Sequence, residues 1–126
     1  LALAAFLDYV RRYPLVAFHA RFDATLLERE LRSRLDLRFR ALWVDAAHVA
    51  AALFPQSGGE SWGLDQWLAF FGIENNARHD ALADAFSTAQ LFLVLLARAS
   101  SQGIGDARAL IGLGRAHREL THWRSN

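Results

Sequence analysis

A histidine and two aspartates have the side chains and positions to hold a metal ion and move a proton. His79 precedes Asp84 by five positions, just before an apolar stretch at residues 86–97. Asp23 follows a shorter apolar stretch at residues 15–18. Carboxylates bind hard ions such as Mg²⁺ and Mn²⁺, and a histidine that titrates near neutrality can take a proton from water. Considered one at a time, each residue is better explained as a helix cap or an ordinary loop residue.

Two motifs around these residues resemble those of the DEDDh 3'-5' exonucleases, the family of RNase T, oligoribonuclease and the proofreading epsilon subunit of bacterial DNA polymerase III. Residues 14–23, PLVAFHARFD, are similar to the family's second motif, which usually reads P-L-V-A-H-N-A-x-F-D. Phe18 stands where that motif has its histidine, and His19 where it has its asparagine. The third motif, H-x-A-x-x-D, is matched in full by His79, Ala81 and Asp84. A spaced pair of motifs is more specific than either alone.

The resemblance covers roughly residues 1–99 and implies part of a ribonuclease H-like fold with a two-metal site. By resemblance, Asp84 binds a metal ion directly, and Asp23 does so directly or through water. His79 then takes the proton from the attacking water, while Mg²⁺ or Mn²⁺ stabilises the developing charge. The residues implied to contact substrate are His19, Phe18 and Phe22, although core packing explains Phe18 equally well. The implied substrates are DNA or RNA 3' ends, and the implied partner is a DNA polymerase subunit.

The family's first motif, Asp-x-Glu on a first strand followed by a strand meander, has no counterpart in the 126 residues. The sequence has no methionine, and Leu1 lies inside a periodic apolar segment. We therefore expect an internal fragment with an incomplete metal site, which alone binds metal weakly and is inactive. Its exposed sheet edge is expected to be covered by upstream residues or by another chain, for example in a homo-oligomer.

Two other functions remain open. A degenerate exonuclease domain would act as a non-catalytic module that binds a polymerase or another protein. An HD-type phosphohydrolase would use His48, His79, Asp80 and Asp106 as metal ligands, but its spacing is loose and the two apolar strands argue against it.

The composition sets few limits on function. The formal net charge is +1, so no overall basic field indicates a nucleic-acid partner. All 14 basic side chains are arginine, which suits phosphate recognition but is explained first by a GC-rich coding sequence. Arg21 and Arg78 flank the motifs, and we expect them to be solvated rather than bound to phosphate. With no cysteine, no signal peptide and an apolar run at 91–97 too short to span a bilayer, we expect a cytoplasmic protein.

The pattern of apolar residues predicts an α/β fold with two parallel strands and surrounding helices. Strands are expected at residues 15–18 and 41–44, both covered on their two faces. Helices are expected near 3–10, 22–35, 46–54, 64–71 and 81–99, followed by a helical extension within residues 100–126. Because parallel strands end at one edge, His19, Asp23 and Asp45 should meet there.

The remaining residues of interest are given structural roles. We expect Asp45, Asp80 and Asp106 to cap helices and Trp67 to lie in the core. The residues expected to point inward from the helix at 22–35 are Phe22, Leu26, Leu27 and Leu31. His48, His117 and His122 are expected to be ordinary residues. Gly112 and Gly114 cost the last helix about 2 kcal/mol together, so that helix must depend on tertiary contacts.

Overall fold

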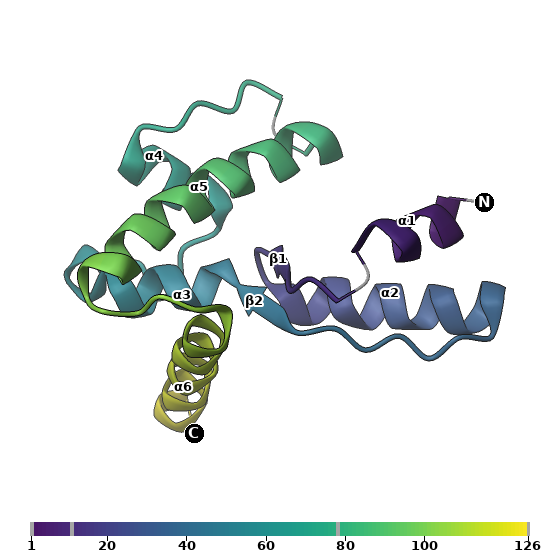
Figure 1. Cartoon of the computed structure of the whole chain (residues 1–126). Coiled ribbons are helices and arrows are strands. Elements are labelled where there is room, and N and C mark those ends of the chain that lie inside the picture. Colours follow the sequence, from purple (N-terminus) through teal and green to yellow (C-terminus); the bar gives the residue numbers. More distant parts are fainter. Residues whose placement is uncertain (1, 11, 78, 126) are drawn as a thin grey trace.

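The computed structural model describes residues 2–10, 12–77 and 79–125, and Arg78 therefore lies outside the described residues. Its elements are α1 (Ala2–Val10), β1 (Leu15–Ala17), α2 (Ala20–Leu35), β2 (Trp43–Asp45), α3 (Ala46–Leu53), the short 3-10 helix η1 (Pro55–Ser57), α4 (Leu64–Phe71), α5 (Ala81–Ser101) and α6 (Ala107–Ser125). Figure 1 shows α3 to α6 grouped on one side of the strands, with α1, α2 and the segment after α2 extending to the other.

The predicted α/β class and the parallel pair of strands are confirmed. In the described chain β1 and β2 form a two-stranded parallel sheet, with Val16 opposite Val44. Helix α2 connects the two strands, as the alternation of apolar runs and helical periodicity indicates. Both strands are shorter than predicted, because Phe18 already belongs to the turn before α2 and β2 begins only at Trp43.

The prediction that both strands are covered on their two faces is wrong. Every residue of β1 is only half-buried, and Val44 alone is fully buried in β2. The reason is an open cavity of about 430 Å³ over the sheet, whose walls include Val16, Val44, Phe92 and Leu96. The neighbouring helix therefore covers this face of the sheet incompletely.

The hydrophobic core lies among α3, α4 and α5. Trp67 is fully buried, as predicted, and packs with Leu53, Leu91 and Leu95. The indole Nε1 of Trp67 has no hydrogen-bond partner among the residues that the structure describes, so shape and apolar contact hold this ring.

Helix α6 packs against α3 and β2 and contributes Leu110 to the core. A Cβ at Gly114 would lie 3.2 Å from Cγ2 of Val49 on α3, so the absence of a side chain lets the two helices approach closely. Gly114 therefore weakens the isolated α6 helix, as expected, but also permits the close contact with α3 that stabilises α6 in the folded chain.

Helix α5 buries one stripe of its surface and exposes another. Its buried residues are Ser87, Leu91, Leu95 and Ala99, each four positions apart. The large apolar residues exposed on it are Leu82, Phe86, Leu93 and Leu96. In the described chain α5 is the single helix long and apolar enough to cross a membrane, a criterion that core helices of soluble proteins also meet. The structure is compatible with a soluble protein.

The inward face predicted for α2 is only partly correct. Leu31 is fully buried, but Phe22 is 72% and Leu26 is 46% exposed. The prediction assumes that another element packs along the whole apolar face of the helix. In the structure Phe22 and Leu26 border an open cavity instead.

Candidate functional site at the ends of the strands

The carboxylate of Asp45 organises the edge at which both strands end. Asp45 caps α3, because its Oδ1 accepts a hydrogen bond from the Ala47 N–H at 3.1 Å. The same oxygen accepts from the His19 N–H at 3.1 Å, and Oδ2 accepts from the Ala20 N–H at 3.2 Å. One side chain thus fixes the starts of both α2 and α3 against the end of β2, a larger role than the predicted cap.

His19 and Asp23 lie at the same edge, as the parallel strands predict. His19 precedes α2 in the left-handed region, with φ 61°, and its exposed ring contacts Phe18 edge-on with 4.7 Å between ring centroids. Phe18 packs against the core. Asp23 is in the first turn of α2. Burial raises the pKa of Asp23, the Asp45 carboxylate raises this pKa further, and a backbone hydrogen bond and His19 oppose both effects. Two carboxylates are therefore close enough to repel.

The residues of the third motif form a separate local structure at the start of α5. Asp84 Oδ2 accepts a hydrogen bond from the backbone N–H of His79 at 3.2 Å, and its Oδ1 accepts from Asn75 Nδ2 at 2.9 Å. Asp80 caps the helix through the Ala83 N–H at 3.0 Å, as predicted. His79 is exposed and has φ 75°. The carboxylate of Asp84 is thereby held beside a histidine that faces solvent.

The structure does not bring the two predicted metal ligands, Asp23 and Asp84, together. Figure 1 shows the first turn of α5 apart from the start of α2. Within the described residues there is no group of three His, Asp or Glu side chains that could hold a metal ion. The shared metal site therefore stays a prediction. The same finding applies to the HD-type ligands: His48 is bonded to another histidine, and Asp106 caps α6 through the Ala109 N–H at 2.8 Å, as predicted.

A cavity of about 690 Å³ opens at the strand ends, between α2, α3 and α6. His19 and Phe22, which the motif resemblance implies to contact substrate, are in its wall together with Asp45 and His48. His79 and Asp84 are not part of this wall. Arg21, expected to be solvated, is exposed but also borders the cavity.

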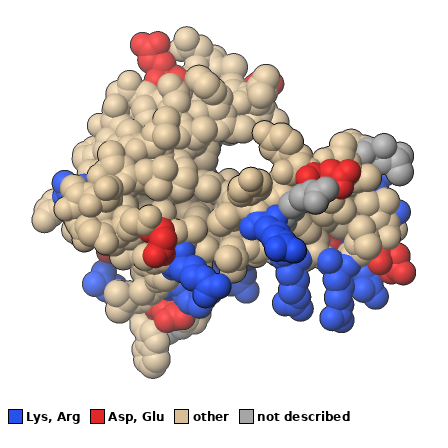
Figure 2. Space-filling view, viewed as in Figure 1, with Lys and Arg blue, Asp and Glu red and all other residues tan. Residues whose placement is uncertain are grey.

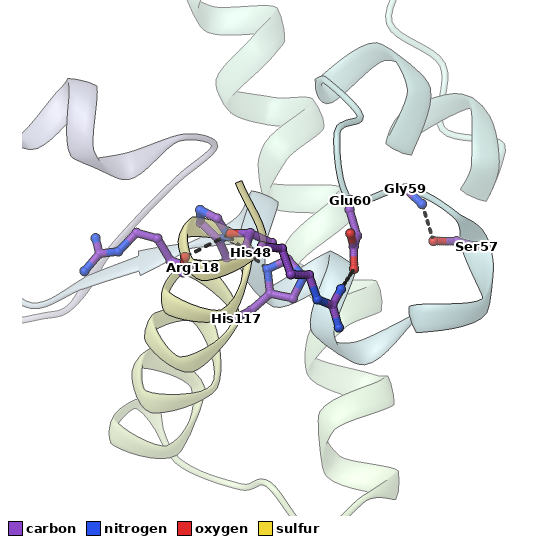
Figure 3. Close-up of polar contacts among 8 residues, drawn as sticks. His48, Ser57, Gly59, Glu60, His117 and Arg118 are labelled. Carbon is purple, nitrogen blue, oxygen red and sulfur yellow. Dashed lines mark hydrogen bonds and ion pairs between the residues drawn. The ribbon is translucent and has the colours of Figure 1, made fainter. Parts of the chain in front are cut away.

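Sequence reasoning missed a histidine pair that joins α3 to α6. Nδ1 of His48 lies 3.0 Å from Nδ1 of His117, so one ring donates a hydrogen bond and the other accepts it (Figure 3). The two residues are 69 positions apart, and no local pattern in the sequence pairs them. They are partners rather than ordinary surface residues.

Burial lowers the pKa of both histidines in this pair. For His48, Asp45 opposes the effect, while His117, Arg118 and His19 lower the pKa further. For His117, Glu60 opposes it and Arg124 lowers the pKa further. Glu60 and Arg124 are themselves joined by an ion pair of 2.9 Å. A neutral pair, with one shared proton between the rings, is the state that burial favours.

Comparisons with protein-family models, with curated proteins and with solved structures found no match for this chain.

Proposed function

We propose that this chain carries the second and third motifs of a metal-dependent 3'-5' exonuclease that acts on DNA or RNA 3' ends, within a ribonuclease H-like fold. The observation that carries the proposal is the unit at the start of α5, where the backbone N–H of His79 holds the Asp84 carboxylate at 3.2 Å. This contact keeps a proton acceptor and a metal-binding group side by side, and the exposed histidine can reach a water molecule.

Backbone strain at both motif histidines supports the proposal. Only three non-glycine residues in the described chain have positive φ, and two of these are His19 and His79. Left-handed backbone is unfavourable for residues with a side chain, and such strain gathers at functional sites. The surrounding hydrogen bonds to Asp45 and Asp84 hold both histidines in these conformations.

Hard carboxylate oxygens suit Mg²⁺ or Mn²⁺. Burial is the main cause of the raised pKa of Asp23 and the Asp45 carboxylate raises it further, so a cation beside these two carboxylates would offset both effects. The geometry of the described residues does not complete such a site, since Asp23 and Asp84 are apart. The proposal therefore includes an Asp-x-Glu segment, as the motif resemblance expects, to supply the remaining carboxylates.

The test uses the protein as it is naturally expressed, with a 5'-labelled oligonucleotide and Mn²⁺. We expect shortening from the 3' end, and a loss of orders of magnitude in rate in His79→Ala and in Asp84→Ala, because these groups act as a unit. His122→Ala and Asp106→Ala are the matched controls, since neither residue belongs to the motifs. A wild-type rate in Asp84→Ala would refute the assignment.

The exposed apolar stripe of α5 favours one alternative, a non-catalytic module that binds a polymerase subunit. Leu82 and Phe86 are 80% and 66% exposed, and both lie on the first two turns of α5 beside the motif residues. If this alternative holds, Leu82→Ser with Phe86→Ser abolishes binding to the polymerase subunit, His79→Ala leaves binding intact, and no variant degrades oligonucleotides.

A further inference from the structure

The cavity at the strand ends has a basic wall contributed by two helices far apart in the sequence. Arg21 and Arg29 come from α2, and Arg118 comes from α6. Figure 2 shows how unevenly charge is distributed: basic side chains project along the lower edge, over α2 and the segment after it, while the α4–α5 part is almost free of them. In this view most of the visible basic side chains therefore lie along the lower edge, although the net charge of the chain is only +1.

These three arginines have no ion-pair partner among the described residues, in contrast to other arginines nearby. Arg34 pairs with Glu30 at 2.8 Å, and Arg32 lies 3.5 Å from Asp36. The carboxylate in the cavity wall, Asp45, already accepts three backbone N–H groups with its two oxygens. These bonds occupy the carboxylate oxygens, and Asp45 forms no ion pair with the cavity arginines in the described part of the chain, so the guanidinium groups remain available to an anion from outside.

The position of Arg118 is fixed by the contacts of α6. The hydrogen bond between His48 and His117 and the close approach of Gly114 to Val49 hold α6 against α3. Figure 3 shows the Arg118 side chain extending from α6 away from the loop that carries Glu60. Arg118 lies close enough to His48 to lower the pKa of that histidine. The positive charge of Arg118 therefore acts on a residue of the cavity wall.

The cavity also offers an apolar surface. Phe22 is 72% and Leu26 is 46% exposed, and both residues belong to its wall. An exposed aromatic ring beside guanidinium groups can stack with a flat group whose phosphate those guanidiniums bind. The volume of about 690 Å³ is in the range of small-molecule sites.

We propose that this cavity binds a phosphorylated ligand of nucleotide size, with the phosphate held by Arg21, Arg29 and Arg118 and a flat group against Phe22. The phosphate belongs either to a free nucleotide or to a nucleic-acid strand. The proposal rests on the cavity itself, not on the nuclease assignment: the wall does not include His79 or Asp84, and binding requires no metal ion.

The test is a binding titration of the whole chain in EDTA, with inorganic phosphate and with AMP as ligands. Amide chemical shifts in NMR are the readout. We expect saturable shifts at His19, Thr25 and His48, and weaker binding at high salt. Arg29→Gln and Arg118→Gln should each weaken AMP binding roughly tenfold, as expected for a lost hydrogen bond to a charged group. The matched control is Arg108→Gln, an exposed α6 arginine outside the cavity.

Phe22→Ala separates the two parts of the ligand, because this exposed ring contributes little to folding. It should weaken AMP and leave inorganic phosphate unchanged. A short single-stranded oligonucleotide that binds more tightly than AMP identifies a strand phosphate, and the reverse order identifies a free nucleotide. Absence of saturable binding by all three probes, or AMP binding that is unchanged in both arginine variants, would overturn the proposal. Because EDTA removes divalent ions, these results are independent of nuclease activity.

Discussion

Replacing Asp45 by alanine should destabilise the fold more than any ordinary cap substitution. The change removes the acceptor of three backbone N–H groups at once, those of His19, Ala20 and Ala47. Ala20 is only 3% exposed, so water cannot easily replace the carboxylate there. The starts of α2 and α3 both lose their link to the end of β2.

The magnitude follows from these three bonds. Loss of the cap on α3 costs about 1 kcal/mol. The bonds to His19 and Ala20 contribute about 1 kcal/mol each, at the modest end for a charged acceptor because the site is only partly buried. The free energy of unfolding should therefore fall by about 3 kcal/mol. For a chain of this size that lowers Tm by about 10 °C.

Urea and thermal unfolding measure this effect, with Asp106→Ala as the control. Asp106 accepts a single N–H, from Ala109 at 2.8 Å, and its loss should cost about 1 kcal/mol. Asp45→Asn keeps one acceptor oxygen and should lie between the two. In that variant an NMR titration should also show a lower pKa for Asp23, still above its ordinary value because burial is the larger cause. An Asp45→Ala variant no less stable than Asp106→Ala would refute this reasoning.

Three further outcomes are expected. Burial lowers the pKa of His48 and His117 below 6.5, so the stability that the neutral pair contributes is complete above pH 6.5 and is lost as the pH falls through the folded-state pKa values. Urea unfolding across this range should show a smaller change of the free energy of unfolding with pH in His117→Gln than in the wild type. Burial and the Asp45 carboxylate both raise the pKa of Asp23, so its charged form is unfavourable in the folded state. At neutral pH the Asp23→Asn variant should therefore be more stable by up to about 1 kcal/mol, discounted for partial exposure, as urea unfolding would measure. Gly59→Ala would place a Cβ 2.7 Å from Cζ2 of the buried Trp67, which should lower Tm through about 2 kcal/mol of overpacking, while Gly58→Ser, in open space but at φ 76°, tests strain alone.

The sequence predicted those features that depend on neighbours along the chain. Asp45, Asp80 and Asp106 all cap helices, because a cap is set by a side chain and an amide two or three positions away. The parallel pairing followed from two short apolar runs separated by a helix. The exposed face of α2 could not be predicted in the same way, since periodicity indicates which residues share a face and not whether another element covers it.

The candidate site likewise has one part that could be predicted from local sequence and one part that could not. His79 and Asp84 were recognisable from a local motif, and the contact between them is local as well. The basic cavity depends instead on α6, which the motif resemblance does not cover and which we expected to be an extension. In the structure α6 supplies Arg118 to the cavity wall and His117 to the bond with His48. Because α6 contributes core residues, a histidine partner and a guanidinium group, it belongs to the same structural unit as the strands. The strands and α6 together therefore determine which chemical groups line the cavity at the strand ends.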